Sequence, residues 1–126
     1  MNRPSPMALI FILITIIFTV TGQILVKQGM LELGPSPTQA PELVNFVWKA
    51  LTNPRVILGL ASAVIAALAW TVALSHSDLS FAYPFMSLAI VLVIALSPLI
   101  FHEAIPWTRW LGVVIVCIGI LIASRS

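Results

Sequence analysis

One stretch near the N-terminus carries polar side chains at helical spacing inside an otherwise apolar run. Thr15, Thr19, Gln23 and Lys27 follow one another at intervals of four residues, and Gly22 precedes Gln23. Because residues four apart share a face of a helix, the sequence predicts one polar stripe. An amide and an ammonium group on that stripe can line a polar cavity and attract an anion such as a phosphate.

A second polar pair stands at the start of a later apolar run. Tyr83 and Ser87 are four residues apart and are expected on one helix face. Pro84, between them, is expected in the first helical turn, where its missing N–H costs little. Pro98 lies deeper and is expected to kink or end the helix. Tyr83 can alternatively be an aromatic residue of the membrane boundary.

The remaining titratable side chains form no pattern typical of catalysis or metal binding. His76 with Asp78 and His102 with Glu103 belong to two connections expected at opposite membrane faces, so they cannot share one metal ion within a monomer. Glu103 can cap the next helix as an acidic residue near its start, or pair with Lys27. With no nucleophile–base pair and no cofactor fingerprint, we expect no enzyme, no cofactor and no metal.

The composition indicates lipid rather than water as the main solvent. Of the 126 residues, 60% are apolar and 8% are charged, whereas about a quarter of a soluble domain is charged. Between Arg55 and Arg109 the formal charges are Asp78 and Glu103. The six basic side chains are scattered, so the net charge of +2 predicts no nucleic-acid partner. We therefore expect an integral membrane protein in contact with membrane lipid.

Four apolar runs are long enough to span the bilayer, for which a helix needs about 20 residues. They cover residues 7–30, 56–75, 81–101 and 107–124, and predict an all-α membrane protein with a single transmembrane domain over residues 1–126. Short connections make neighbouring helices antiparallel. Arg3 precedes the first run, but no small-residue cleavage pattern follows, so we interpret the run as a retained helix rather than a signal peptide.

The linker between the first two spans, residues 31–55, differs in composition. Gly34 and three prolines at positions 35 to 41 interrupt the helix. Apolar residues then recur at helical spacing among polar ones, which predicts a short amphipathic helix over about 42–52 in the membrane interface. Trp48, Trp107 and Trp110 stand at segment ends, where an aromatic belt would place them.

The fourth run carries small residues on one face. Gly112 and Gly119 are seven residues apart, and small residues allow helices to approach closely in lipid. This face is a candidate dimer interface, although packing within the chain is the alternative. The basic residues are divided too evenly between the two membrane sides to fix the orientation. Such an even distribution of basic residues is typical of a protein that inserts in both orientations or pairs with an inverted partner.

Lys27 has two possible roles. It can extend its ammonium group along the helix to the lipid headgroups, or it can line a polar cavity with Gln23. A lysine at the bilayer centre costs about 2.5–3.5 kcal/mol on insertion scales, and such residues usually face a cavity or the bundle interior. Gln23 lies one turn deeper than Lys27 and reaches the headgroups less easily, which favours the cavity.

Several of these motifs resemble the drug/metabolite transporter superfamily, specifically its four-helix members. Thr21-Gly22-Gln23 with Lys27-Gln28 resembles the first-helix pattern of the small subunits of the aminoarabinose–undecaprenyl-phosphate flippase. Two further motifs resemble the same subunits, namely Ala82-Tyr83-Pro84 with Ser87-Leu88, and His102-Glu103 with Pro106, Arg109-Trp110 and Gly112. The Tyr-Pro and His-Glu portions of these motifs are shared with the wider EamA-type families. The linker 31–55 is longer than in those subunits.

The resemblance implies a subunit of the bacterial inner membrane that flips a polyprenyl-phosphate-linked sugar or a related lipid anion. Such a subunit works as a homodimer or as a heterodimer with a sister four-helix subunit. The implied substrate-binding residues are Gln23 and Lys27 for the phosphate, Tyr83 and Ser87 for the polar headgroup, and Thr19 beside them. Pro84 and Glu103 are expected to have structural or gating roles.

Two other functions remain open. The same register matches small multidrug resistance pumps, which export cationic compounds through a carboxylate three residues before the first-helix glycine. Here Thr19 occupies that position. Met86 stands where those pumps have an aromatic residue, three residues after the tyrosine. The chain can also be a non-transporting partner subunit of a larger membrane complex, against which the intramembrane Gln23 and Lys27 argue mildly.

Overall fold

The computed structural model describes residues 6–125 as five helices, with no strand in that range. They are α1 (Pro6–Leu33), α2 (Ala40–Thr52), α3 (Pro54–Ser75), α4 (Leu79–Ile100) and α5 (Trp107–Arg125). All except α2 are long and apolar enough to cross a membrane. The predicted all-α membrane fold, with four spans and a shorter helix between the first two, is confirmed. Arg3 lies outside the described residues.

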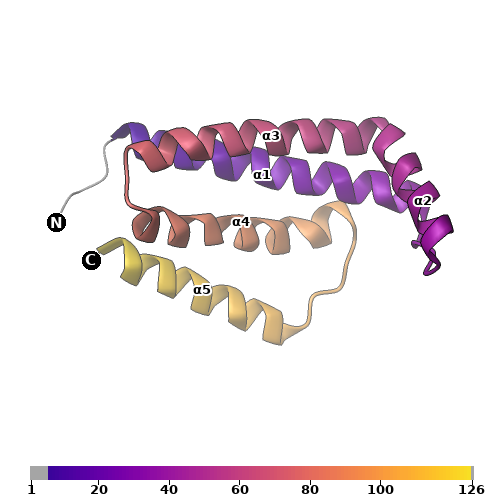
Figure 1. Ribbon diagram of the computed structural model, residues 1–126. Coiled ribbons are helices and arrows are strands. Elements are labelled where there is room, and N and C mark those ends of the chain that lie inside the picture. Colours follow the sequence, from indigo (N-terminus) through magenta and orange to yellow (C-terminus); the bar gives the residue numbers. More distant parts are fainter. Residues whose placement is uncertain (1–5, 126) are drawn as a thin grey trace.

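The long helices alternate in direction along the chain (Figure 1). α1 and α3 lie side by side, and α2 joins them at one end of the bundle. We call this the α2 end, and it also holds the connection between α4 and α5. The opposite end, which we call the termini end, holds the start of α1, the α3–α4 connection and the end of α5.

The most extensive contact between helices joins α1 and α3. Gly22 and Gly29 of α1 and Gly59 of α3 are buried in it. A Cβ atom on Gly29 would lie 2.5 Å from Cγ2 of Val56, so a larger residue would push the helices apart. α4 completes the core, whose buried side chains are Ile12, Ile16, Val20, Ala73, Ala82 and Ala89.

α5 lies at the edge of the bundle. Among the described helices it contacts α4 and no other (Figure 1). Ile120 is the one buried residue of its described part, and most of its large apolar side chains are exposed. Such a surface suits lipid or another apolar protein surface rather than water.

α2 is amphipathic, as the linker sequence predicts. Ala50 is its one buried residue, whereas most of its large apolar side chains are exposed. These exposed side chains are Leu43, Val44, Val47, Trp48 and Leu51. The position of this helix in the membrane interface stays a prediction.

The two prolines of α4 differ in their position along the helix. The helix begins at Leu79, so Pro84 is its sixth residue and lies beyond the first turn where we expected it. The helix starts earlier because the carbonyl oxygen of Asp78 already accepts hydrogen bonds from the N–H groups of Phe81 and Ala82, at 3.2 and 3.0 Å. Pro84 thus lies where a helical residue normally donates its N–H to the carbonyl four residues earlier, and proline has no N–H to donate. Pro98, in contrast, precedes the helix end by two residues.

Glu103 does not take either of the expected roles. α5 begins at Trp107 with no acidic residue in its first turn, and Glu103 lies in the connection before it. The reason is Pro106, which disfavours helical geometry in the residue before it and whose carbonyl oxygen accepts the first bond, from the N–H of Arg109 at 3.0 Å. Among residues 6–125 the ion pair is Glu32 with Arg55, so Glu103 does not pair with Lys27 either.

Candidate functional site

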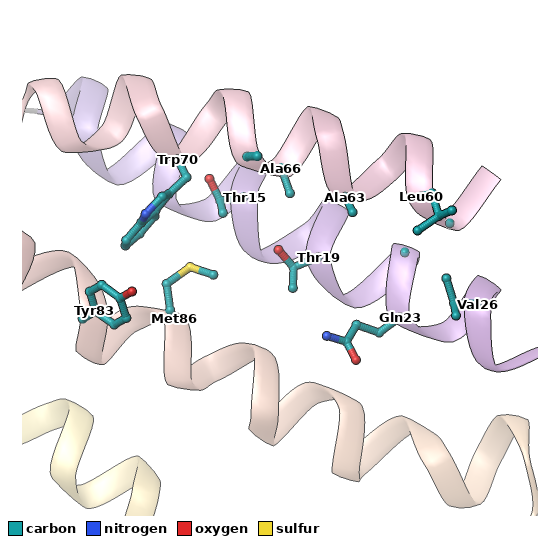
Figure 2. A pocket seen from close by; sticks show the side chains of 13 residues that line it. Thr15, Thr19, Gln23, Val26, Leu60, Ala63, Ala66, Trp70, Tyr83 and Met86 are labelled. Atoms are coloured by element: carbon teal, nitrogen blue, oxygen red, sulfur yellow. The ribbon is translucent and has the colours of Figure 1, made fainter. Parts of the chain in front are cut away.

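α1, α3 and α4 line a cavity of about 580 Å³ that is partly open to the outside of the bundle (Figure 2). This volume lies within the range of about 300–1,000 Å³ that is typical of small-molecule sites. Its walls are formed by Thr15, Thr19, Gly22, Gln23, Val26, Gly59, Leu60, Ala63, Ala66, Ala67, Trp70, Tyr83 and Met86. No lining residue carries a charge, so the cavity offers a ligand neutral polar groups and aromatic rings rather than charged partners.

The polar wall of the cavity comes from α1. Thr15, Thr19 and Gln23 project from one face of this helix, in the arrangement that their spacing predicts. Thr15 is buried, and its hydroxyl donates to the carbonyl oxygen of Phe11 at 2.7 Å. Its oxygen atom can therefore still accept a hydrogen bond from an occupant of the cavity.

Gln23 has the most available polar group of this wall. Its amide extends from α1 toward α4 in Figure 2, and the structure assigns it no hydrogen bond within residues 6–125. Gln23 and Thr19 also border a smaller cavity of about 200 Å³ that reaches α4 at Ala89 and Val93. The amide can thus turn toward a ligand on either side of α1.

Small residues of α3 form a second wall, beside that of α1 (Figure 2). Gly59, Ala63, Ala66 and Ala67 leave space because they carry at most one side-chain carbon each. The alanine-rich composition of this span therefore leaves room for the cavity as well as allowing close packing against α1. Larger side chains at these positions would fill the cavity.

Two aromatic rings close the cavity toward the termini end. Trp70 of α3 and Tyr83 of α4 meet edge to face, with ring centroids 5.5 Å apart and an angle of 89° between the planes. Met86 stands beside them, one turn along α4 (Figure 2). Tyr83 is 58% exposed, so it borders both the cavity and the outside of the bundle.

The structure brings only part of the predicted substrate site together. Thr19, Gln23 and Tyr83 line the cavity, whereas Lys27 and Ser87 do not. Lys27 is exposed and lies four residues beyond Gln23 toward the α2 end, a rise of about 6 Å along the helix. The predicted phosphate-binding pair is thus divided between the cavity and its outer edge.

Trp70 is the main lining residue that the predicted site lacks, together with Met86 and the small residues of α3. The sequence held one signal for Trp70. The other three tryptophans stand at segment ends, whereas Trp70 lies within an apolar run. A tryptophan away from the interface needs a partner for its ring and its N–H, and this requirement could have indicated an internal site.

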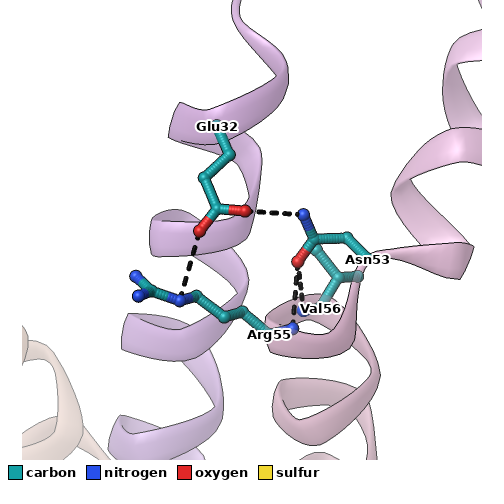
Figure 3. Close-up of polar contacts among 4 residues, drawn as sticks. All are labelled: Glu32, Asn53, Arg55 and Val56. Carbon is teal, nitrogen blue, oxygen red and sulfur yellow. Dashed lines mark hydrogen bonds and ion pairs between the residues drawn. The ribbon is translucent and has the colours of Figure 1, made fainter.

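A polar cluster of Glu32, Asn53 and Arg55 joins α1 to α3 at the α2 end (Figure 3). Asn53 Nδ2 donates to Glu32 Oε2 at 3.0 Å, and Arg55 Nε lies 3.2 Å from Glu32 Oε1. Asn53 Oδ1 caps α3 by accepting from the N–H groups of Arg55 and Val56, at 2.9 and 3.3 Å. Since Glu32 is occupied by this cluster, the ammonium group of Lys27 keeps no carboxylate partner within residues 6–125.

The small-residue face of α5 is open. A Cβ atom on Gly112 or Gly119 would meet no heavy atom within 4 Å, and both glycines are exposed. The alternative that this face packs within the chain is therefore excluded for the described residues. A subunit interface at Gly112 and Gly119 stays a prediction.

Comparison with known proteins gives a consistent match over nearly the whole chain. The EamA-like transporter family matches residues 3–125. The chain is 33% identical over 116 residues to the probable 4-amino-4-deoxy-L-arabinose-phosphoundecaprenol flippase subunit ArnE of Aeromonas hydrophila, covering 92% of this chain and 96% of that protein. It is 34% identical over 115 residues to the corresponding ArnE of Serratia proteamaculans, covering 91% and 93%.

A second type of flippase subunit is also similar. The chain is 30% identical over 119 residues to the probable 4-amino-4-deoxy-L-arabinose-phosphoundecaprenol flippase subunit ArnF of Erwinia tasmaniensis, covering 92% of this chain and 93% of that protein. No solved structure matches the chain significantly.

Proposed function

The chain belongs to the EamA-like transporter family as a multi-pass protein of the bacterial inner membrane, and we propose that it is a flippase subunit for a polyprenyl-phosphate-linked amino sugar. The observation that carries this proposal is the cavity whose polar wall, Thr15, Thr19 and Gln23, leads along α1 to Lys27. A lipid-linked sugar needs such a polar path, because its headgroup cannot cross hydrocarbon without partners.

The similar flippase subunits define the substrate class through their names, as 4-amino-4-deoxy-L-arabinose joined to undecaprenol by a phosphate. Such a substrate has a phosphate anion, an amino sugar and a long apolar tail. The tail remains in lipid, and only the compact headgroup needs the cavity.

Lys27 supplies the attraction for the phosphate. Its ammonium group has no acidic partner within the described residues and lies one turn from the Gln23 amide, which can donate a second hydrogen bond. The cost of holding a cation near the hydrocarbon decreases when an anion binds to it. The headgroup then follows the polar wall of α1 into the cavity.

A second subunit completes the pathway in this proposal. The cavity of one chain is open to the outside of the bundle, and α5 presents an open face with Gly112 and Gly119. Because the chain resembles both ArnE-type and ArnF-type subunits, a sister four-helix subunit is the partner that we favour over a second copy. Rocking of one subunit against the other would expose the cavity to each membrane face in turn.

Export of cationic drugs is less well supported. A proton-coupled pump needs an acid in the membrane, and the lining residues of this cavity include neither aspartate nor glutamate. The position of the acid in those pumps is occupied by Thr19, which cannot exchange a proton with a cation near neutral pH.

The test is flipping in proteoliposomes that contain the chain with its sister subunit and an amino-sugar lipid. Transport is measured as the amine that becomes accessible to an impermeant reagent on the opposite face. We expect flipping by the wild-type pair and a clear loss for Gln23→Leu, with Gln28→Leu as the matched control, because Gln28 does not line the cavity. Wild-type vesicles that label no faster than empty ones would refute the proposed function.

A further inference from the structure

The polar path along α1 is longer than a sugar headgroup. Lys27 and Thr15 are twelve residues apart on one helix, which corresponds to about 18 Å along its axis. Thr15 lies at the end of the cavity where Trp70 and Tyr83 meet (Figure 2). One phosphorylated sugar ring is considerably shorter, so it cannot contact Lys27 and the aromatic end at the same time.

The aromatic end has the chemistry of a cation site without a carboxylate. The faces of aromatic rings carry negative potential and attract ammonium groups, and tryptophan does so most strongly. In the edge-to-face pair of Trp70 and Tyr83, the ring that offers its edge keeps both faces free of its partner. Oxygen acceptors stand nearby, because Thr15 and Thr19 share the cavity with the tyrosine hydroxyl.

An ammonium group is more strongly attracted there than it would be in water. The cavity lies between three spans, where a low dielectric strengthens the interaction of a cation with ring faces and oxygen atoms. No lining side chain is cationic, so nothing in the wall repels the ligand, and Lys27 lies outside at the other end.

We propose that Trp70 and Tyr83 form a separate binding position for the ammonium group of the lipid-linked amino sugar, which is occupied only after the phosphate has left Lys27. This inference rests on the proposed function and deepens it. With the ammonium group between Trp70, Tyr83 and Thr15, the phosphate lies beside Thr19 and Gln23, about one to two turns further along α1. Lys27 captures the lipid, and the aromatic position selects its amino sugar.

The proposal predicts that the protein prefers the amino-sugar lipid to its N-acetylated form, and that this preference depends on Trp70. Binding to the chain with its sister subunit is measured for three lipids, namely the amino-sugar lipid, its N-acetylated form and the sugar-free polyprenyl phosphate. We expect the wild-type pair to bind the amino form about tenfold more tightly than the acetylated form, because acetylation removes the cation. Trp70→Leu should abolish this preference and leave the affinity for the sugar-free lipid unchanged.

Two further variants distinguish the binding of a cation by Trp70 from a contribution of this residue to helix packing. Trp70→Phe should keep part of the preference, because phenylalanine retains a weaker ring face. Trp110→Leu on exposed α5 should keep all of it. Retained binding of the sugar-free lipid shows that Trp70→Leu is folded.

The negative results of this experiment distinguish an error in the ammonium position from an error in the proposed function. If the wild-type pair binds both sugar lipids equally, or if Trp70→Leu weakens all three lipids alike, the ammonium position is wrong while the flippase function stands. If the wild-type pair binds none of the lipids, the proposed function itself fails. If a soluble quaternary ammonium compound displaces the amino-sugar lipid from the wild-type pair but not from the Trp70→Leu pair, the result supports the binding of a cation at Trp70.

Discussion

Gly22 and Gly59 bring the backbones of α1 and α3 into direct contact. A Cβ atom on either glycine would lie 2.7 Å from the carbonyl oxygen of the other. Both residues also line the cavity, so the same contact that holds the two helices together fixes the distance between the polar wall and the alanine-rich wall. Packing and site geometry therefore depend on the same pair.

Gly59→Ala is expected to destabilise the protein by about 1–3 kcal/mol, as is typical of added bulk in a tightly packed position. The new methyl group would also meet the backbone nitrogen of Val26 at 3.0 Å, which cannot move independently of α1. Thermal unfolding in mild detergent measures the effect. Gly119→Ala is the control, because its Cβ would meet nothing within 4 Å. Equal unfolding temperatures for the two variants would contradict the close contact.

The polar cluster at the α2 end should depend more on Asn53 than on its ion pair. Glu32→Gln removes a pair whose side chains are about half exposed, so its effect should stay below about 1 kcal/mol. Asn53→Ala removes the cap of α3 as well as the bond to Glu32, and a lost cap costs about 1 kcal/mol or more. The opposite order of unfolding temperatures would show that the cluster is held mainly by charge.

The open face of α5 leads to a prediction about assembly. Replacing both Gly112 and Gly119 with leucine should weaken association with the partner subunit, because bulk on a small-residue face separates the helices. Native mass measurement or crosslinking in mild detergent reports the change. Ala61→Leu on an exposed position of α3 is the matched control. Unchanged assembly of the double variant would place the interface on another face.

The number and type of the helices could be predicted because apolar length alone determines a span. The polar stripe of α1 followed from spacing, since four-residue intervals give one face in any regular helix. Pro84 was placed wrongly because the start of α4 depends on the carbonyl of Asp78, a local hydrogen-bonding choice that periodicity does not reveal.

The composition of the cavity was harder to predict than its polar wall. Trp70 belongs to the site because α3 packs against α1 through Gly59, which rotates the alanine and tryptophan face toward α4. That rotation is a property of the packed bundle rather than of one segment. Lys27 and Ser87 share faces with lining residues, yet the cavity does not extend to them.

A carboxylate in the cavity should oppose the proposed substrate. Thr19→Glu places an acid in the middle of the polar wall, next to Gln23, where it would repel the lipid phosphate in a low dielectric. Flipping should fall by an order of magnitude or more, while Thr19→Gln retains more of it. Resistance to quaternary ammonium dyes should not appear, because an acid alone does not supply the missing pump machinery. A gain of dye export by Thr19→Glu would favour a pump.

The most direct measurement is the flipping rate of Lys27→Met in proteoliposomes with the sister subunit. Methionine keeps most of the apolar side chain and loses the charge, so insertion should be unaffected or improved. A charge-assisted hydrogen bond of about 1.5–3 kcal/mol corresponds to a loss of roughly 10- to 150-fold. Lys27→Arg should retain part of the rate, and Lys49→Met on α2 should retain all of it. A wild-type rate for Lys27→Met would show that the lysine only reaches the headgroups and that the phosphate site must be abandoned.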